Sequence, residues 1–242
     1  MRSGISFIRG FRFVNLLPIL ILIQTACMTD DNEVEEEIMG YNYFPLELGN
    51  YRIYEVTEIN YTVQEQPDTT VYFLKELIAD TSRDQTGQKI HYIYTYRRDD
   101  PFVSWEKEPV TVMVARQTRS NLVITENNIS FVRMIFPVKA GKSWDGNAFN
   151  TFEAMFYHYI SEDIQSGSAA TGSGNRIRVI RRDYDDGVIR RDVCFEIYAE
   201  NTGMVYRESS ALEYCQDVSC LGEEKIESGR EIFQQLIEYG QE

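Results

Sequence analysis

The 242-residue sequence is poor in histidine, with only His91 and His158. Ser-His-Asp triads and His-based zinc sites both depend on imidazole groups, so neither is well supported. His158 lies in an alternation of apolar residues from Phe152 to Ile160, which favours a core or rim histidine over a general base. No catalytic or cofactor motif stands out elsewhere, and we expect no metal and no cofactor.

Basic residues are also scarce, because 24 Lys and Arg stand against 38 Asp and Glu, for a formal charge of −14. A surface with this excess of negative charge repels phosphate backbones, so nucleic-acid binding is not expected. Attraction to anionic lipid is excluded for the same reason. The aromatic share of 13% is ample for a folded core.

The apolar stretch near the N-terminus, Val14–Ile23, is too short to cross a bilayer, which takes about 20 apolar residues. Three arginines precede it, so the segment has the layout of a signal peptide. Thr25 and Ala26 then precede Cys27, and this arrangement resembles a bacterial lipobox with Gln24 in place of the usual Leu. We therefore expect a lipid on Cys27. The alternative is an ordinary secretory signal cut near Ala26.

Acidic residues crowd the chain directly after Cys27 and would repel one another, so that the segment stays extended and solvated. They are Asp30, Asp31, Glu33, Glu35, Glu36 and Glu37. The stretch resembles the export signal that sends Bacteroidota lipoproteins to the outer face of the outer membrane. We expect a signal peptide over residues 1–26, a lipidated tether over 27–43 and one β domain over 44–242. The cell surface is favoured over the periplasmic face of the outer membrane.

Three cysteines remain after Cys27. Cys215 and Cys220 lie five residues apart, and in an exported protein we predict a disulfide between them rather than two free thiols. Such a bridge stabilises by roughly 2 kcal/mol on the chain-entropy estimate. Cys194 is the odd one: alternation places it on one face with Asp192 and Glu196, whose charges oppose thiol activation. A bystander role is expected for it.

From Tyr51 onward the dominant sequence period is two, which predicts strands. Turn residues separate these runs, and Asp186-Gly187 is the signal of a two-residue hairpin turn. The pattern predicts ten to twelve strands in an antiparallel meander, forming a strongly curved sheet or open barrel in a single, mostly β domain. Any helix that is present is expected to be confined to short pieces around Trp105–Glu108 or Glu213–Cys220.

Two stretches, Phe44–Gly49 and Phe136–Gly141, share the pattern Phe-Pro-aliphatic-charged-x-Gly. Proline presets an extended entry and glycine permits a turn, so shared turn chemistry explains the echo, and a duplicated half-domain is the alternative. Together with Tyr43–Tyr54 and Tyr198–Val205, these motifs resemble a family of Bacteroidota outer-membrane lipoproteins. The sequence departs from that family at Arg52, where a tryptophan is common. The resemblance implies no activity.

Two apparent ligand motifs have structural explanations. The glycines of 167–174 have phosphate-loop spacing, but Ser173 stands where a lysine is required. In 183–187 the glycine arrives one place early for a calcium loop. A third pattern stays open: Tyr92, Tyr94 and Tyr96 share one strand face, with Trp105 beyond them. They predict either a ligand-binding wall or, more simply, one wall of the core.

These features favour a lipid-anchored cell-envelope protein that binds or scaffolds and does not catalyse. It would be a monomer held at the outer membrane through Cys27, with an envelope protein or a glycan as partner. The first alternative is a carrier of lipid or another apolar ligand in a curved β-sheet cavity. The second is a glycan hydrolase using two carboxylates, for which the sequence nominates no pair.

Overall fold

The computed structural model describes residues 38–63, 65–162 and 174–242. The predicted signal peptide, Cys27 and the predicted tether as far as Glu37 lie outside these ranges, as does the glycine-rich stretch 167–173. Within the described ranges, no helix has the length and apolar character needed to cross a bilayer.

The described chain is almost entirely β. A single turn of 3-10 helix, η1 (Tyr41–Tyr43), precedes twelve strands. The strands are β1 (Asn50–Tyr61), β2 (Asp68–Arg83), β3 (Lys89–Arg98), β4 (Thr111–Gln117), β5 (Asn121–Glu126), β6 (Ile129–Ile135), β7 (Ser143–Asp145), β8 (Phe156–Glu162), β9 (Arg176–Asp185), β10 (Arg190–Ala199), β11 (Gly203–Tyr214) and β12 (Ile226–Gln241).

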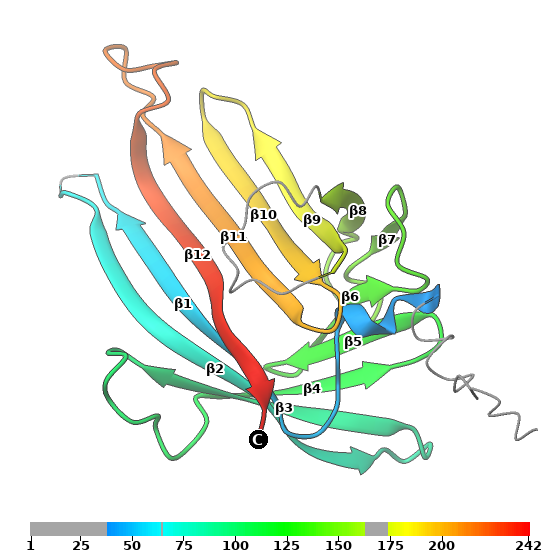
Figure 1. Cartoon of the computed structure of the whole chain (residues 1–242). Helices are drawn as coiled ribbons and strands as arrows, with labels where there is room; N and C mark the ends of the chain where they lie inside the picture. Colours follow the sequence, from blue (N-terminus) through cyan, green and yellow to red (C-terminus); the bar gives the residue numbers. More distant parts are fainter. Residues whose placement is uncertain (1–37, 64, 163–173) are drawn as a thin grey trace, which may run out of the picture.

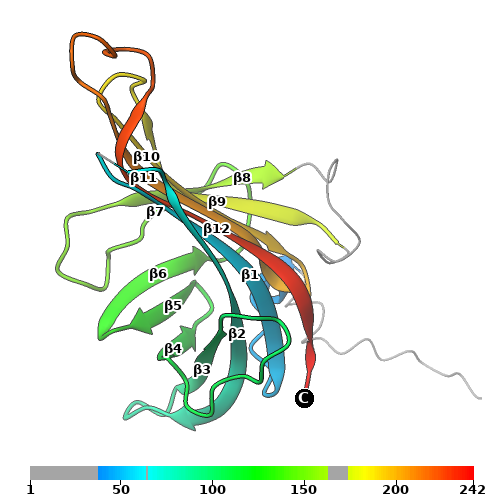
Figure 2. The same ribbon diagram turned by 90° about the vertical axis from the view of Figure 1, so that its left-hand side faces the viewer.

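All twelve strands belong to one antiparallel sheet with the order β6-β5-β4-β3-β2-β1-β12-β11-β10-β9-β8-β7. The first and last strands therefore pair at the centre of the sheet, and β6 and β7, which are neighbours in the chain, lie at its two edges. The sheet curls so far that these edges approach each other (Figures 1 and 2). The predicted antiparallel meander in a strongly curved sheet or open barrel is confirmed.

Strand alternation determines which side chains form the core. In β1, Tyr54 and Val56 are fully buried in the barrel interior, whereas Glu55 between them is exposed. The same alternation continues around the sheet, and large buried residues such as Tyr157, Tyr159 and Met134 complete one continuous hydrophobic cluster. The interior is therefore a packed core along much of its length rather than an open channel.

The seam between the two edges is joined by single hydrogen bonds instead of a strand ladder. Val132 N–H donates to the carbonyl of Gly146 at 2.9 Å, and Trp144 Nε1 donates to the carbonyl of Val132 at 2.8 Å. The Tyr159 hydroxyl accepts from Ile135 N–H and donates to the Ile135 carbonyl, both at 3.0 Å. These bonds satisfy edge groups of β6 that would otherwise be free to pair with another chain.

The segment around η1 covers one end of the barrel beside this seam. Val138 N–H, in the β6–β7 connection, donates to the carbonyl of Met39, and Asn201 N–H, in the β10–β11 turn, donates to the carbonyl of Asn42. Tyr43 is buried in the core cluster. Packing against the domain thus begins several residues before Phe44, where the sequence predicted the β domain to start.

The glycines of the two related motifs are used in the same way, although the Phe136-Pro137 peptide bond is cis and the Phe44-Pro45 bond is not. Gly49 and Gly141 have φ of 87° and 84°, a backbone conformation that favours glycine. Gly49 N–H donates to the carbonyl of Ile78 in β2, and Gly141 N–H donates to that of Tyr159 in β8. Each glycine therefore lies just before the first strand of one half of the sheet, β1 of β1–β6 or β7 of β7–β12. It bonds to the second strand of the same half, β2 or β8.

One local prediction was wrong. The β9–β10 connection spans residues 186–189 instead of two residues, because the Asp186 carboxylate accepts N–H groups from Val188, Ile189 and Arg190 and so stabilises a wider loop. The two regions to which any helix was expected to be confined are not helical: residues 105–108 are irregular, and the stretch from Glu213 continues β11 into a disulfide-closed turn.

Replacing Tyr159 by Phe would remove the hydroxyl that serves both edge groups of Ile135. Because a buried group loses its partner, we expect the free energy of unfolding to fall by about 1–3 kcal/mol, measured by urea denaturation. Tyr94→Phe is the matched control, since the Tyr94 hydroxyl makes no hydrogen bond within the described residues. Equal stability of the two variants would show that the Tyr159 hydroxyl does not hold the seam.

Candidate functional site

A buried carboxylate surrounded by arginines lies inside the barrel. The side chain of Glu196, on β10, is 1% exposed. Its Oε1 accepts hydrogen bonds from Arg133 Nη1 at 2.8 Å and from Arg181 Nη1 at 3.0 Å. The Tyr198 hydroxyl donates to Oε2 at 2.7 Å, and Arg207 Nε lies 4.0 Å from Oε1. Three guanidinium groups thus stand against one carboxylate.

Irregularities in strand pairing direct these arginines inward. On β6 the register passes from Met134 to Val132, so Arg133 is the extra residue of a β-bulge, and on β9 Arg181 is the extra residue in the same way. On β11 the extra residue is Val205, which lets Met204 and Arg207 both face the interior. Bulges change the direction of side chains and are common beside functional sites.

The cluster holds its charges firmly. Burial alone would raise the pKa of Glu196, but the charges of the three arginines and the Tyr198 hydrogen bond lower this pKa to about 2. Burial and the neighbouring Glu196 charge raise the pKa of Tyr198 well above 10. Glu196 is therefore ionised at neutral pH and has no proton to give up, and Tyr198 stays neutral.

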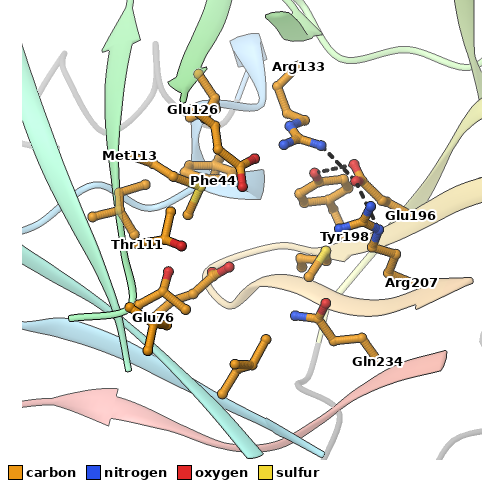
Figure 3. A pocket seen from close by; sticks show the side chains of 16 residues that line it. Phe44, Glu76, Thr111, Met113, Glu126, Arg133, Glu196, Tyr198, Arg207 and Gln234 are labelled. Atoms are coloured by element: carbon orange, nitrogen blue, oxygen red, sulfur yellow. Dashed lines mark hydrogen bonds and ion pairs between the residues drawn. The ribbon is translucent and has the colours of Figure 1, made fainter. Parts of the chain in front are cut away.

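The cluster forms one wall of a cavity of about 200 Å³ inside the barrel (Figure 3). Its polar lining comes from strands all around the sheet: Glu76, Thr95, Thr111, Glu126, Arg133, Glu196, Tyr198, Arg207 and Gln234. Its apolar lining is Phe44, Leu74, Ile93, Val110, Met113, Ile124 and Met204. We call this cavity the inner pocket.

Several polar groups of the inner pocket have no partner within the described residues. Gln234 is 5% exposed, yet its side-chain amide makes no hydrogen bond there, and neither does the carboxylate of Glu126. Arg207 approaches Glu196 only at 4.0 Å, and its Nε has no hydrogen-bond partner. Gln234 is buried, whereas Glu126 is half-buried and the Arg207 side chain is 34% exposed. All three groups have hydrogen-bonding capacity that water or a polar ligand can take up.

A larger cavity, of about 290 Å³, lies beside η1 and is lined partly by Tyr41, Pro45, Lys89 and His91. Burial, followed by the nearby Lys89 charge, lowers the pKa of His91 below its usual value. We take the inner pocket as the candidate site, because its charged groups are directed into one space by bulges. No group of three or more His, Cys, Asp or Glu side chains in the described ranges is arranged to hold a metal ion.

The predicted tyrosine wall lies elsewhere. Ile93 and Thr95 of β3 line the inner pocket, so the alternating residues Tyr92, Tyr94 and Tyr96 face outward. Tyr92 and Tyr94 pair with Val114 and Val112 of β4, which continue this outer face. Trp105 lies in the β3–β4 loop, under the guanidinium of Arg98 at 4.2 Å. None of the four aromatic residues lines the inner pocket.

The structure also places three of the cysteines. Cys215 and Cys220 form a disulfide that closes the turn after β11, as the spacing predicts. Cys194 is a free thiol and is buried. It shares the inward face of β10 with Glu196 and Tyr198, so the face that the sequence marks as polar is the buried one.

Sequence reasoning missed the inner pocket. The sequence singles out Glu196 only as a neighbour of Cys194, and it does not single out Arg133, Arg181 or Arg207. A signal does exist in the sequence for Glu196, which lies in a strand rich in apolar residues, where a charge needs a partner when it is buried. Arg181 gives no such signal, because most residues of β9 are charged. The identity of the partner of Glu196 is set by the bulges.

Comparison with known proteins assigns no family to this chain. No protein-family model and no curated protein matches the sequence. A solved structure from Bacteroides fragilis, described as a candidate exported protein with a YmcC-like fold, is similar with a TM-score of 0.40 and 11% identity. The match covers 82% of this chain and 98% of that one. A similarity of this size assigns no ligand or activity to the present chain.

Replacing Glu196 by Gln would leave Arg133 and Arg181 buried without an opposing charge. We expect the free energy of unfolding at pH 7 to fall by about 3–5 kcal/mol. Replacing three residues together, with Glu196→Leu, Arg133→Met and Arg181→Met, removes both buried arginine charges, leaves only the partly exposed Arg207, and is expected to restore most of that loss. If Glu196→Gln were as stable as the wild type, Glu196 would not be needed to balance the buried arginine charges.

The low pKa of Glu196 also predicts how the stability of the protein depends on pH. The pKa of Glu196 is lower in the folded chain than the usual 4.5, so its contribution to stability is present above pH 4.5 and is lost as the pH falls towards 2. Between pH 5 and pH 2, the free energy of unfolding of the wild type, measured by urea denaturation, should therefore fall by roughly 3 kcal/mol more than that of Glu196→Gln. Parallel stability curves for the two proteins would refute this.

Proposed function

We propose that this protein is a lipid-anchored binding protein of the cell envelope that holds a small polar ligand in its inner pocket. The observation that carries the proposal is the set of polar groups in that pocket with no hydrogen-bond partner within the described residues: Gln234, Glu126 and Arg207. Gln234 is buried, so leaving its amide unsatisfied costs free energy, and the partly exposed Glu126 and Arg207 can be satisfied by water or by a ligand. A bound ligand would recover that free energy.

The size and lining of the inner pocket argue against the apolar-carrier alternative. Its volume of about 200 Å³ is below the range of about 300–1,000 Å³ usual for drug-sized ligands. Three glutamates and two arginines line it, and burying acyl chains against them would leave charged groups without water. We therefore propose a small polar ligand rather than a lipid, and binding rather than catalysis.

The anchor is supported by the sequence of the N-terminal segment. A basic region, a short apolar stretch and small residues precede Cys27, and acidic residues follow it. A protein held in this way at the outer membrane, with its pocket in the folded domain, would present the ligand close to the membrane surface. The proposal favours the outer face of that membrane.

Cells expressing the protein with radiolabelled palmitate test the anchor. We expect the wild-type chain to carry label and Cys27→Ser to carry none, because Cys27 is the attachment site. Cys194→Ser is the control and should stay labelled, since that thiol is buried in the folded domain. Label on Cys27→Ser, or no label on the wild type, would remove the anchor from the proposal.

Native mass spectrometry of the full chain, purified in detergent from cell envelopes, tests the ligand. We expect an additional small mass that disappears on denaturation and is absent from Thr111→Trp, whose indole would fill the pocket. Thr70→Trp, on the exposed part of β2, should retain the mass. A ligand-free wild type, or equal retention by both variants, would count against the inner pocket as a binding site.

A further inference from the structure

The inner pocket has a polarity that indicates the chemistry of its ligand. Figure 3 shows Arg207 and Gln234 on one side and Glu76 and Glu126 on the other. The first pair belongs to β11 and β12, and the second pair belongs to β2 and β5. One side thus offers hydrogen-bond donors with a positive charge, and the other offers carboxylates.

The donor side has an excess of positive charge. Both oxygens of Glu196 already accept hydrogen bonds from Arg133, Arg181 and Tyr198, so Arg207 is a third cation beside a carboxylate whose bonding is largely satisfied. Arg207 lies directly opposite Gln234 in the β11–β12 ladder, which brings guanidinium and amide donors side by side. An arginine placed in this way binds an anionic oxygen group such as a carboxylate.

The opposite side offers one free acceptor. Glu76 is already engaged, because Arg52 Nε lies 3.6 Å from its Oε2 and the Tyr54 hydroxyl donates to it at 3.4 Å. Glu126 has no such contact within the described residues, although it lines the same cavity. A ligand that brings an ammonium group to Glu126 would pair this carboxylate.

Apolar side chains make up the rest of the pocket lining. Leu74, Ile93, Met113, Ile124 and Met204 line it. They leave room for a compact apolar group, and the two methionines can adapt their shape to it. A fully charged or highly hydroxylated molecule would leave its polar groups unpaired against this part of the wall.

We propose that the ligand of the inner pocket is a small zwitterion with an apolar side chain, such as a free apolar amino acid. Its carboxylate binds Arg207 and Gln234, its ammonium group binds Glu126, and its side chain packs on the apolar wall. This inference rests on the proposed function and adds the ligand class to it.

Isothermal titration calorimetry on the full chain in detergent tests the ligand class. The probes are leucine, methionine and phenylalanine, each with its N-acetyl derivative, such as N-acetylleucine, which lacks the ammonium group, and its amide, such as leucinamide, which lacks the carboxylate. We expect at least one of the three amino acids to bind. Its N-acetyl derivative and its amide, which each lack one of the two charges, should bind about 10- to 100-fold more weakly, as the loss of a charged hydrogen bond implies. A derivative that binds as well as the parent would overturn the inference.

Two variants locate the recognition. Arg207→Gln should weaken the amino acid about 10- to 100-fold yet leave the weak binding of leucinamide unchanged, because leucinamide has no carboxylate to lose. Glu126→Gln should have the same effect on the amino acid and spare N-acetylleucine. The exposed Arg190→Gln and Glu213→Gln are the matched controls and should bind like the wild type. Loss of binding in the controls would overturn the assignment.

The two levels of the proposal fail separately. A retained ligand of another chemistry in the inner pocket, for example a neutral sugar, with no binding of the three amino acids, would overturn the zwitterion and leave the binding function standing. A pocket that retains nothing in native mass spectrometry and binds none of the probes would overturn both.

Discussion

The contact between Arg133 and Glu196 joins parts of the barrel that no strand ladder joins. Arg133 belongs to β6 at one edge of the sheet, and Glu196 belongs to β10, across the seam. Without this ion pair, the two edges would be held by a few single hydrogen bonds and by the aromatic residues around Trp144. The shape of the inner pocket depends on this contact, because the same glutamate also binds Arg181 and lies 4.0 Å from Arg207.

Buried ion clusters of this kind are weak sources of stability, since removing two charges from water costs nearly as much as their attraction returns. Their value lies in geometry. A carboxylate with hydrogen bonds from two strands and a tyrosine permits few arrangements of those strands, so it determines how the curved sheet closes. The bulges at Arg133 and Arg181 belong to the same arrangement, because an unbroken alternation would direct each of these side chains according to its neighbours.

The sequence predicts the architecture of the molecule better than its site. Alternation such as Tyr54-Glu55-Val56 is local, so it identifies strands and their buried face without knowledge of the partner. A bulge is different: it depends on which strand lies alongside, and nothing in Ile180-Arg181-Arg182 states that the first arginine faces inward. The same limit applies to Tyr92, Tyr94 and Tyr96, whose aromatic character fits either face, and to Glu196, whose arginine partners lie in three other strands. The width of the Asp186 loop also escaped prediction, because it follows from one carboxylate that binds three backbone N–H groups.

The pairing of β1 with β12 has a consequence for how the chain folds. Asn50 pairs with Gln241, so the central ladder joins residues from the two ends of the domain. A chain that is synthesised from its N-terminus cannot complete this ladder until Gln241 has emerged. Until then one edge of β1 is unpaired, and contacts of such long range form slowly. That edge of β1 is therefore the part of the growing chain most open to pairing with another chain.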